Sequence, residues 1–244
     1  RAGRADHGAD GVRHGAAVKS PEPFYEERGV TLYNGDAAEI LPAISLPADA
    51  GWVIDPPWDA SIALAPGVRK IVMCDGWRQQ DVFRVHGAPN WIFTWDCISS
   101  WYTRGRPLRR AKYAFWYGPL DEYVCDGAMH GGERESAPRL VRNSRGSYLF
   151  EPNPRGKHLA DVFASPITSL HAGGGHRHEK PGEWIKMLIA NCMGRAPLIV
   201  DPFAGSGSTV DACRQLGIPV VAIDIDRSCC EHIVSRISQA VISA

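Results

Sequence analysis

The segment Asp55-Pro56-Pro57-Trp58 carries residue types that could activate an amino group. It follows the apolar run GWVI, which we expect to be a buried strand that stops at the prolines. An exocyclic amine on an aromatic ring is a poor nucleophile because its lone pair is delocalised. If the Asp55 carboxylate and the Pro56 carbonyl accept its two N–H bonds, the lone pair is freed in a rigid, preorganised turn. Trp58 offers a flat face for stacking a base. The competing interpretation is a strand end with a helix-capping aspartate and a buried tryptophan.

A glycine-rich turn lies between an apolar strand and a helix in the C-terminal part of the chain. It reads DPFAGSGST and comprises Asp201, Pro202, Phe203, Ala204, Gly205, Ser206, Gly207, Ser208 and Thr209. Small residues let a ligand approach the backbone, and the helix N-terminus presents N–H groups. Val210 stands where a dinucleotide fingerprint needs its third glycine, so that fingerprint fails. Asp224, 19 residues after Gly205, ends the next predicted strand and is placed to accept ribose hydroxyls. A tight turn with a surface acid is the simpler alternative.

The elements that position these residues are predicted from apolar periodicity and turn signals. We expect strands over residues 30–34, 51–54, 69–74, 91–96, 197–201 and 218–224, and helices over 183–193, 209–216 and 228–241. Residues 110–125 could hold a strand, and residues 127–147 are expected to be a flexible loop. The strand–helix–strand–helix order after residue 196 predicts a βαβ unit with parallel strands.

Composition excludes several classes of protein. The 244 residues carry no net charge and no run of about 20 apolar residues, so we expect no membrane span. The seven cysteines form no CxxC pair, which indicates reduced thiols in a cytoplasm-like compartment and no zinc site. Residues 1–23 are polar and rich in Gly and Ala, and are expected to be a disordered arm.

The middle of the chain is locally basic. Residues 97–160 contain eleven Arg or Lys and six Asp or Glu, a net charge of +5. We expect a cluster in this segment to contact nucleic acid, and it consists of Arg104, Arg106, Arg109, Arg110 and Lys112. A small satellite core with a solvated basic face is the alternative.

Taken together, these segments resemble the DNA amino-methyltransferases, which act on N6 of adenine or N4 of cytosine. DPPW is similar to the family's catalytic tetrapeptide, and DPFAGSGST to its loop on the methionine side of the cofactor. Asn34-Gly35-Asp36 with Glu39-Ile40-Leu41 is similar to an N-terminal "GD…L" segment, and His176 to Pro181 to an "H-x-x-x-K-P" segment. Because the catalytic motif precedes the cofactor loop, the chain resembles the permuted β-type branch.

The resemblance implies an α/β, Rossmann-like sheet for S-adenosylmethionine-dependent methyl transfer, mostly parallel with one antiparallel edge strand. It implies a catalytic half over residues 24–96, a small target-recognition insertion over 97–175 and a cofactor-binding half over 176–244. Double-stranded DNA is the implied partner, and both a monomer and a homodimer fit the sequence. Asp55, Pro56, Pro57 and Trp58 are the implied catalytic residues. The implied cofactor residues are Asp36, Lys180, Pro181, Asp201, Phe203, Ala204, Gly205, Ser206, Gly207, Thr209 and Asp224.

The resemblance leaves the substrate partly open. Asp rather than Ser before the two prolines favours adenine, and the glycine loop favours DNA over RNA. N4 of cytosine, an RNA adenine and an inactive nucleic-acid-binding module are the remaining alternatives.

Overall fold

The computed structural model describes residues 20–57, 67, 69–101, 109–119, 139–144, 146–150, 160–165, 179–193 and 195–242. Three of the expected site residues, Trp58, Arg104 and Arg106, lie outside these ranges, as do residues 1–19 of the expected arm. Arg109 and Arg110 are described in their backbone, but their side chains are not.

Within the described residues, nine strands form one sheet in the order β1-β2-β11-β10-β3-β4-β6-β5-β9. In chain order they are β1 (Tyr25–Glu27), β2 (Val30–Asn34), β3 (Gly51–Ile54), β4 (Arg69–Asp75), β5 (Trp91–Trp101), β6 (Arg109–Tyr117), β9 (Val162–Ser165), β10 (Ile199–Asp201) and β11 (Val220–Asp224). Neighbours are parallel except where β1 meets β2 and where β6 meets β4 and β5. The sheet is therefore mostly parallel, as expected for this α/β class.

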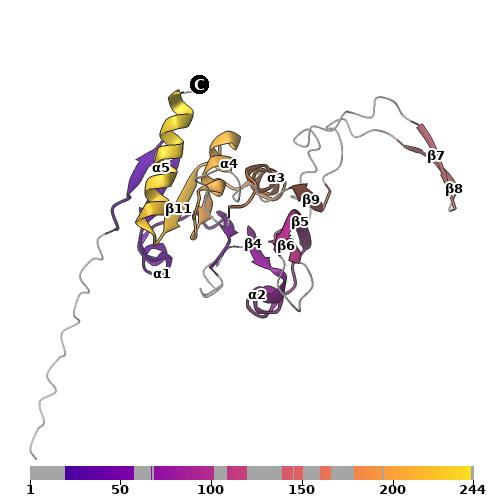
Figure 1. Ribbon diagram of the computed structural model, residues 1–244, viewed down its shortest axis with the longest axis horizontal. Helices are drawn as coiled ribbons and strands as arrows, with labels where there is room; N and C mark the ends of the chain where they lie inside the picture. The colour runs from indigo at the N-terminus through magenta and orange to yellow at the C-terminus, as the bar shows by residue number, and fades with distance from the viewer. Residues whose placement is uncertain are drawn as a thin grey trace, which may run out of the picture.

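Helices cover both faces of the sheet (Figure 1). They are α1 (Ala37–Ile40), α2 (Gln79–His86), α3 (Gly182–Cys192), α4 (Ser208–Leu216) and α5 (Arg227–Ile242), with short 3-10 turns η1 (Leu41–Ala43) and η2 (Gly76–Arg78). In Figure 1, α3, α4 and α5 lie on one side and α1 and α2 on the other. In the part of the chain that is described, no helix is both long and apolar enough to cross a membrane.

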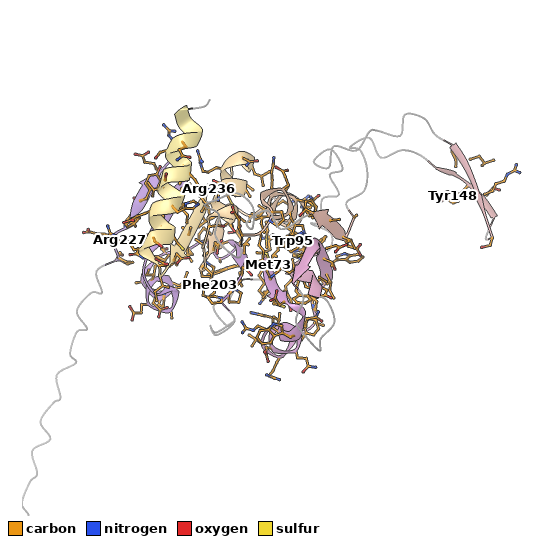
Figure 2. All side chains as sticks on the ribbon, in the orientation of Figure 1. Met73, Trp95, Tyr148, Phe203, Arg227 and Arg236 are labelled. Carbon is orange, nitrogen blue, oxygen red and sulfur yellow. The ribbon has the colours of Figure 1, made fainter. Side chains whose placement is uncertain are left out.

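The alternation of side chains along each strand builds two cores. On β3, Val53 faces the cluster that contains Trp184 of α3, whereas Trp52 and Ile54 face the cluster that contains Val82 of α2. All four residues of β3 are buried, as a central strand covered on both faces requires. Trp95 of β5 packs on Trp184 with ring centroids 5.9 Å apart, and Figure 2 shows Trp95 and Met73 in the body of the molecule.

The sheet has the expected antiparallel edge strand and one antiparallel strand that was not expected. The edge strand is β1, and the unexpected strand is β6, which lies inside the sheet between β4 and β5. Segments expected to belong to an insertion, residues 109–117 and 162–165, thus extend the main sheet. A separate antiparallel ribbon is formed by β7 (Arg139–Asn143) and β8 (Gly146–Phe150). The expectation of a loop over residues 127–147 was therefore wrong for this ribbon.

Candidate active site

Four predicted segments come together at one edge of the sheet. β2, β11, β10 and β3 are consecutive and parallel, so their carboxyl ends meet at the same edge. Asp36 follows β2, Asp224 ends β11, Asp201 ends β10, and Asp55 follows β3. Segments 190 residues apart in the chain are thereby neighbours, since Asp224 pairs in register with Asn34.

The two halves of the site meet where the sheet reverses its direction of winding. From β10 the chain crosses through α4 to β11, the next strand toward β2. From β3 it continues to β4, the next strand in the opposite direction along the sheet. Ligands of open α/β sheets bind outside the carboxyl ends of strands at such a switch point. β10 and β3 are hydrogen-bonded neighbours, with Val200 in register with Trp52. The glycine turn and the Asp55 turn therefore lie side by side at the same edge of the sheet.

Asp55 forms an ion pair with Lys180, which sits just before α3. The lysine side chain is 11% exposed and the Asp55 side chain 32%, so the pair is shielded on the lysine side and open on the aspartate side. The Lys180 carbonyl accepts a hydrogen bond from the Ser208 hydroxyl at 3.3 Å, at the first turn of α4. Lys180 thus links the Asp55 turn to the glycine turn.

Arg78 contacts the Asp55 turn from the side of the neighbouring strand β4. It is 9% exposed, and its Nη1 donates to the Pro57 carbonyl oxygen at 2.9 Å. Arg78 follows β4, the strand next to β3, so a buried guanidinium fixes the peptide that comes directly after the Pro56–Pro57 bond. A charged hydrogen bond of this kind contributes about 1.5–3 kcal/mol.

Asp224 is already organised by backbone donors. One carboxylate oxygen accepts the Gly205 N–H at 2.6 Å and the other accepts the Asp226 N–H at 2.8 Å. Its own carbonyl accepts the Asn34 side-chain amide at 3.0 Å and the Gly35 N–H at 3.0 Å. A carboxylate has about four lone-pair sites, so Asp224 keeps acceptor capacity for a ligand. On the neighbouring β2, Asp36 caps α1 by accepting the Ala38 N–H at 2.8 Å.

Asp201 lies beneath the glycine turn and is 3% exposed. Burial raises the pKa of its carboxyl group to about 7, and the nearby charges of Asp55 and Asp224 add to the rise. Hydrogen bonds from the Thr209 side chain and from the Phe203 N–H, at 3.0 Å, act in the opposite direction. The buried Asp201 carboxyl group is therefore within electrostatic reach of the carboxylates at the ends of two neighbouring strands.

Arg236 of α5 contacts three segments near the glycine turn. Its guanidinium donates to Glu179 at 2.9 Å and to the Ser206 carbonyl at 2.9 Å, and it also pairs with Asp211 of α4. Figure 2 shows Arg236 on the side of α5 that faces α4, with Arg227 at the other end of the helix. One residue thus fixes the middle of the glycine turn and the residue before Lys180.

We expect Arg236→Gln to lower the free energy of unfolding by about 1–3 kcal/mol, because two part-buried carboxylates lose their shared cation. We also expect affinity for the adenosyl cofactor to fall about tenfold, because the Ser206 peptide loses its anchor. Calorimetric titration and urea unfolding measure the two effects.

Arg227→Gln is the matched control, since Arg227 pairs with Glu231 on the same helix but both side chains are more than half exposed. An exposed pair of this kind contributes at most about 1 kcal/mol. Arg236→Lys should recover part of the lost cofactor affinity. If Arg236→Gln and Arg227→Gln have the same cofactor affinity and the same free energy of unfolding, Arg236 does not support the glycine turn.

Most of the predicted cofactor residues meet at this edge. Ala204, Ser206, Gly207 and Thr209 are buried in the turn and the start of α4, Phe203 is half-buried, and Pro181 begins α3. Lys112 instead lies in β6, where its Nζ is 2.7 Å from Asp75 of β4.

Sequence reasoning missed Arg78, Glu179 and Arg236. The signal for Arg236 was a charged residue between the core positions Ile233 and Ile237 of α5. No His, Cys, Asp or Glu cluster of the described chain is arranged to hold a metal ion.

Comparisons with known proteins point to one family. A DNA methylase family model for N6 and N4 methylases matches residues 81–235. The type II methyltransferase M.ScaI of Streptomyces caespitosus is 24% identical over 260 residues, covering 88% of this chain and 84% of that protein. M2.LlaDCHI of Lactococcus lactis subsp. cremoris is 24% identical over 241 residues, covering 86% and 90%.

Solved structures show the same fold. The M1.HpyAVI–SAM complex superposes with a TM-score of 0.56 at 16% identity, covering 85% of this chain and 99% of that one. The PvuII DNA methyltransferase, which is specific for N4 of cytosine, gives a TM-score of 0.55 at 12% identity over 81% and 82% of the two chains. Because the family model spans more than half of the 244 residues and its relatives align along most of the chain, this protein belongs to the N6/N4 DNA methylase family.

Proposed function

We propose that this protein transfers a methyl group from S-adenosylmethionine to the exocyclic amino group of a base in double-stranded DNA, and that the base is adenine, methylated at N6. The observation that carries the proposal is the parallel pairing of β10 with β3, which brings the glycine turn and the Asp55 turn side by side at one edge of the sheet. Aspartate in the first position of the turn supports adenine over cytosine.

The residues of the cofactor half fit this methyl donor. Asp224 has acceptor capacity for the ribose, and Asp36, which follows the neighbouring strand β2, would contact the adenine ring. Gly207 is the N-cap of α4 and provides no side-chain hydrogen bond to the first turn. The N–H groups and the positive end of the helix dipole are therefore available to the carboxylate of the methionine part. A Cβ placed on Gly205 would meet nothing nearer than the Phe203 oxygen at 3.9 Å, which leaves room for a ligand against the turn. When bound, the donor supplies an electrophilic methyl carbon and leaves as a neutral thioether.

Asp55 and Pro56 prepare the amine for attack. The carboxylate of Asp55 and the carbonyl of Pro56 accept the two N–H bonds of the base, so the lone pair points toward the methyl donor. The nitrogen would then take up the methyl group that the donor supplies, and the proton that it loses would pass to the Asp55 carboxylate and from there to solvent. Because Arg78 holds the Pro57 carbonyl, the turn does not have to reorganise during this step.

Lys180 has two roles in this proposal. In the free protein it orients the Asp55 carboxylate through the ion pair. When the base binds, the exocyclic amino group of the base becomes a second donor to the Asp55 carboxylate, which has lone pairs that the Lys180 ion pair does not use. The lysine also keeps the cluster of Asp55, Asp201 and Asp224 from accumulating unbalanced negative charge.

We place DNA recognition in the basic middle segment and in the ribbon of β7 and β8. Residues 139–150 contain Arg139, Arg142 and Arg145 and no acidic residue. A two-stranded ribbon fits the major groove of DNA, and such a ribbon is only marginally stable without a partner. Leu140 and Leu149 are each 59% exposed, and Tyr148, labelled in Figure 2, is 52% exposed. The charge of Lys112 is matched by Asp75, so we assign phosphate contact to the arginines of the cluster rather than to this lysine.

The double variant Arg139→Ala/Arg142→Ala should bind DNA more weakly at every sequence. We expect the slope of log K against log salt concentration to become shallower by about 2, because two phosphate contacts are lost. Cofactor affinity should not change. Fluorescence anisotropy at several salt concentrations measures the slope, with Arg84→Ala/Arg227→Ala as the control for charge removal at exposed pairs. A slope equal to that of the wild type would exclude the ribbon from the DNA contact.

Mass spectrometry of nucleosides tests the proposed reaction. The purified protein is incubated with methyl-labelled S-adenosylmethionine and either unmethylated plasmid DNA or RNA. We expect label in N6-methyladenine from DNA. Label in N4-methylcytosine would reject the adenine assignment, label in RNA alone would reject the substrate, and no transfer to either would reject the enzyme function. Sequencing of the methylated plasmid then identifies the recognition site.

A further inference from the structure

Trp77 is exposed at the carboxyl edge of the sheet. It lies in η2 directly after β4, and 56% of its surface is open to solvent. Of the other tryptophans whose side chains are described, Trp91 is 49% exposed, whereas Trp52, Trp95, Trp116 and Trp184 are at most 5% exposed. An exposed indole adds little to the core, and it is the place of Trp77 at the carboxyl edge, more than its exposure, that suggests a binding role.

The position of Trp77 relative to the Asp55 turn is set by its neighbours. β4 is parallel to β3, so the residues that follow β4 lie at the same edge as Asp55. The next residue, Arg78, donates to the Pro57 carbonyl at 2.9 Å. The Arg78 guanidinium also lies 5.9 Å from the centre of the Trp77 ring, which restrains the indole beside the turn.

We infer that Trp77 supplies a stacking face for the target base once the base has left the DNA helix. This inference rests on the proposed function, since it names the group that receives the base at the same site. An extruded base loses its stacking neighbours on both faces, and an aromatic side chain restores part of that interaction without regard to sequence. The indole presents this face next to the two acceptors that hold the amino group.

Variants of Trp77 and Trp91 test the inference in the full-length protein. The substrate is a duplex carrying the recognition site found by sequencing. We expect Trp77→Ala to lower kcat/KM for this DNA by about 10- to 100-fold, with cofactor affinity unchanged. Trp77→Phe should keep most of the activity. Trp77→Leu should resemble Trp77→Ala, because leucine covers Arg78 but has no aromatic face.

Trp91→Ala is the matched control. Trp91 is 49% exposed and is the first residue of β5. The residue of β5 that lies level with Asp75, the end of β4, is Trp95, four residues further along the strand, because both pair in register with Lys112. Trp91 therefore lies about 13 Å from the catalytic edge along the strand direction. Its replacement should leave kcat/KM within about twofold of the wild type.

A fluorescent base reports stacking directly. With 2-aminopurine at the target position, the wild-type complex should be quenched by the indole, and the Trp77→Ala complex should be brighter. If Trp77→Ala methylates the duplex as fast as Trp91→Ala and shows wild-type fluorescence, Trp77 does not contact the base. That result would leave the proposed function intact, whereas methylation by Asp55→Ala at the wild-type rate would overturn the proposed function itself.

Discussion

Asp55→Ala is expected to lower kcat for methyl transfer by at least about 10²–10³-fold, the size of effect seen when one preorganised polar group is removed from an active site. The amine then lacks the acceptor that frees its lone pair. Affinity for the cofactor should stay within about fivefold, because Asp224 and the glycine turn are unaffected. Single-turnover transfer of labelled methyl and calorimetric titration separate the two quantities.

Two further variants make this result specific to the carboxylate. Asp55→Asn keeps an acceptor oxygen but removes the charge that pairs with Lys180, so we expect activity between that of alanine and wild type. Asp81→Ala removes an exposed carboxylate on α2 and should have little effect. Loss of cofactor binding in parallel with activity would mean that Asp55 serves the cofactor and not the base.

Gly207→Ala should produce the second large effect. Gly207 has a φ of +84°, and a Cβ placed there would lie 2.7 Å from Cγ1 of Ile233, which is 1% exposed on α5. The left-handed backbone costs about 1–2 kcal/mol for alanine and the overpacking about 1–3 kcal/mol. Because the same backbone opens α4 at the carboxyl edge of the sheet, we expect cofactor affinity to fall at least about tenfold.

Gly217→Ala separates conformation from contact. Gly217 ends α4 with a φ of +68°, and nothing lies within 4 Å of its virtual Cβ. This variant should lose only the free energy that the left-handed backbone conformation costs an alanine, and its cofactor affinity should equal that of the wild type. Urea unfolding and calorimetry of both variants provide the comparison, and equal losses would show that Ile233 moves aside without effect on the turn.

The meeting of the candidate segments at one edge was predictable from sequence, because each segment has a local pattern. Each motif consists of an apolar run and the polar or glycine-rich residues that follow it, as in β3 with Asp55 and β10 with Gly205. Such patterns predict a buried parallel strand and the edge at which its functional residues lie. The alignment of four such ends then follows from one sheet order.

The features that were missed depend on partners distant in sequence. Arg78 is 21 residues from Pro57, and Arg236 is 57 from Glu179. The place of β6 between β4 and β5 is set by long-range pairing, which its Arg-rich start did not indicate. The ribbon did have a local signal, since short segments with β-branched or aromatic residues, RLV and YLF, flank the turn-forming sequence Asn-Ser-Arg-Gly.

A crystal structure of the protein with S-adenosylhomocysteine tests the central claim most directly. The account predicts that the ligand lies across the carboxyl ends of β11 and β10, with its ribose at Asp224 and its sulfur turned toward Asp55. A ligand bound at this edge with its sulfur directed away from Asp55, or bound elsewhere on the molecule, would contradict it.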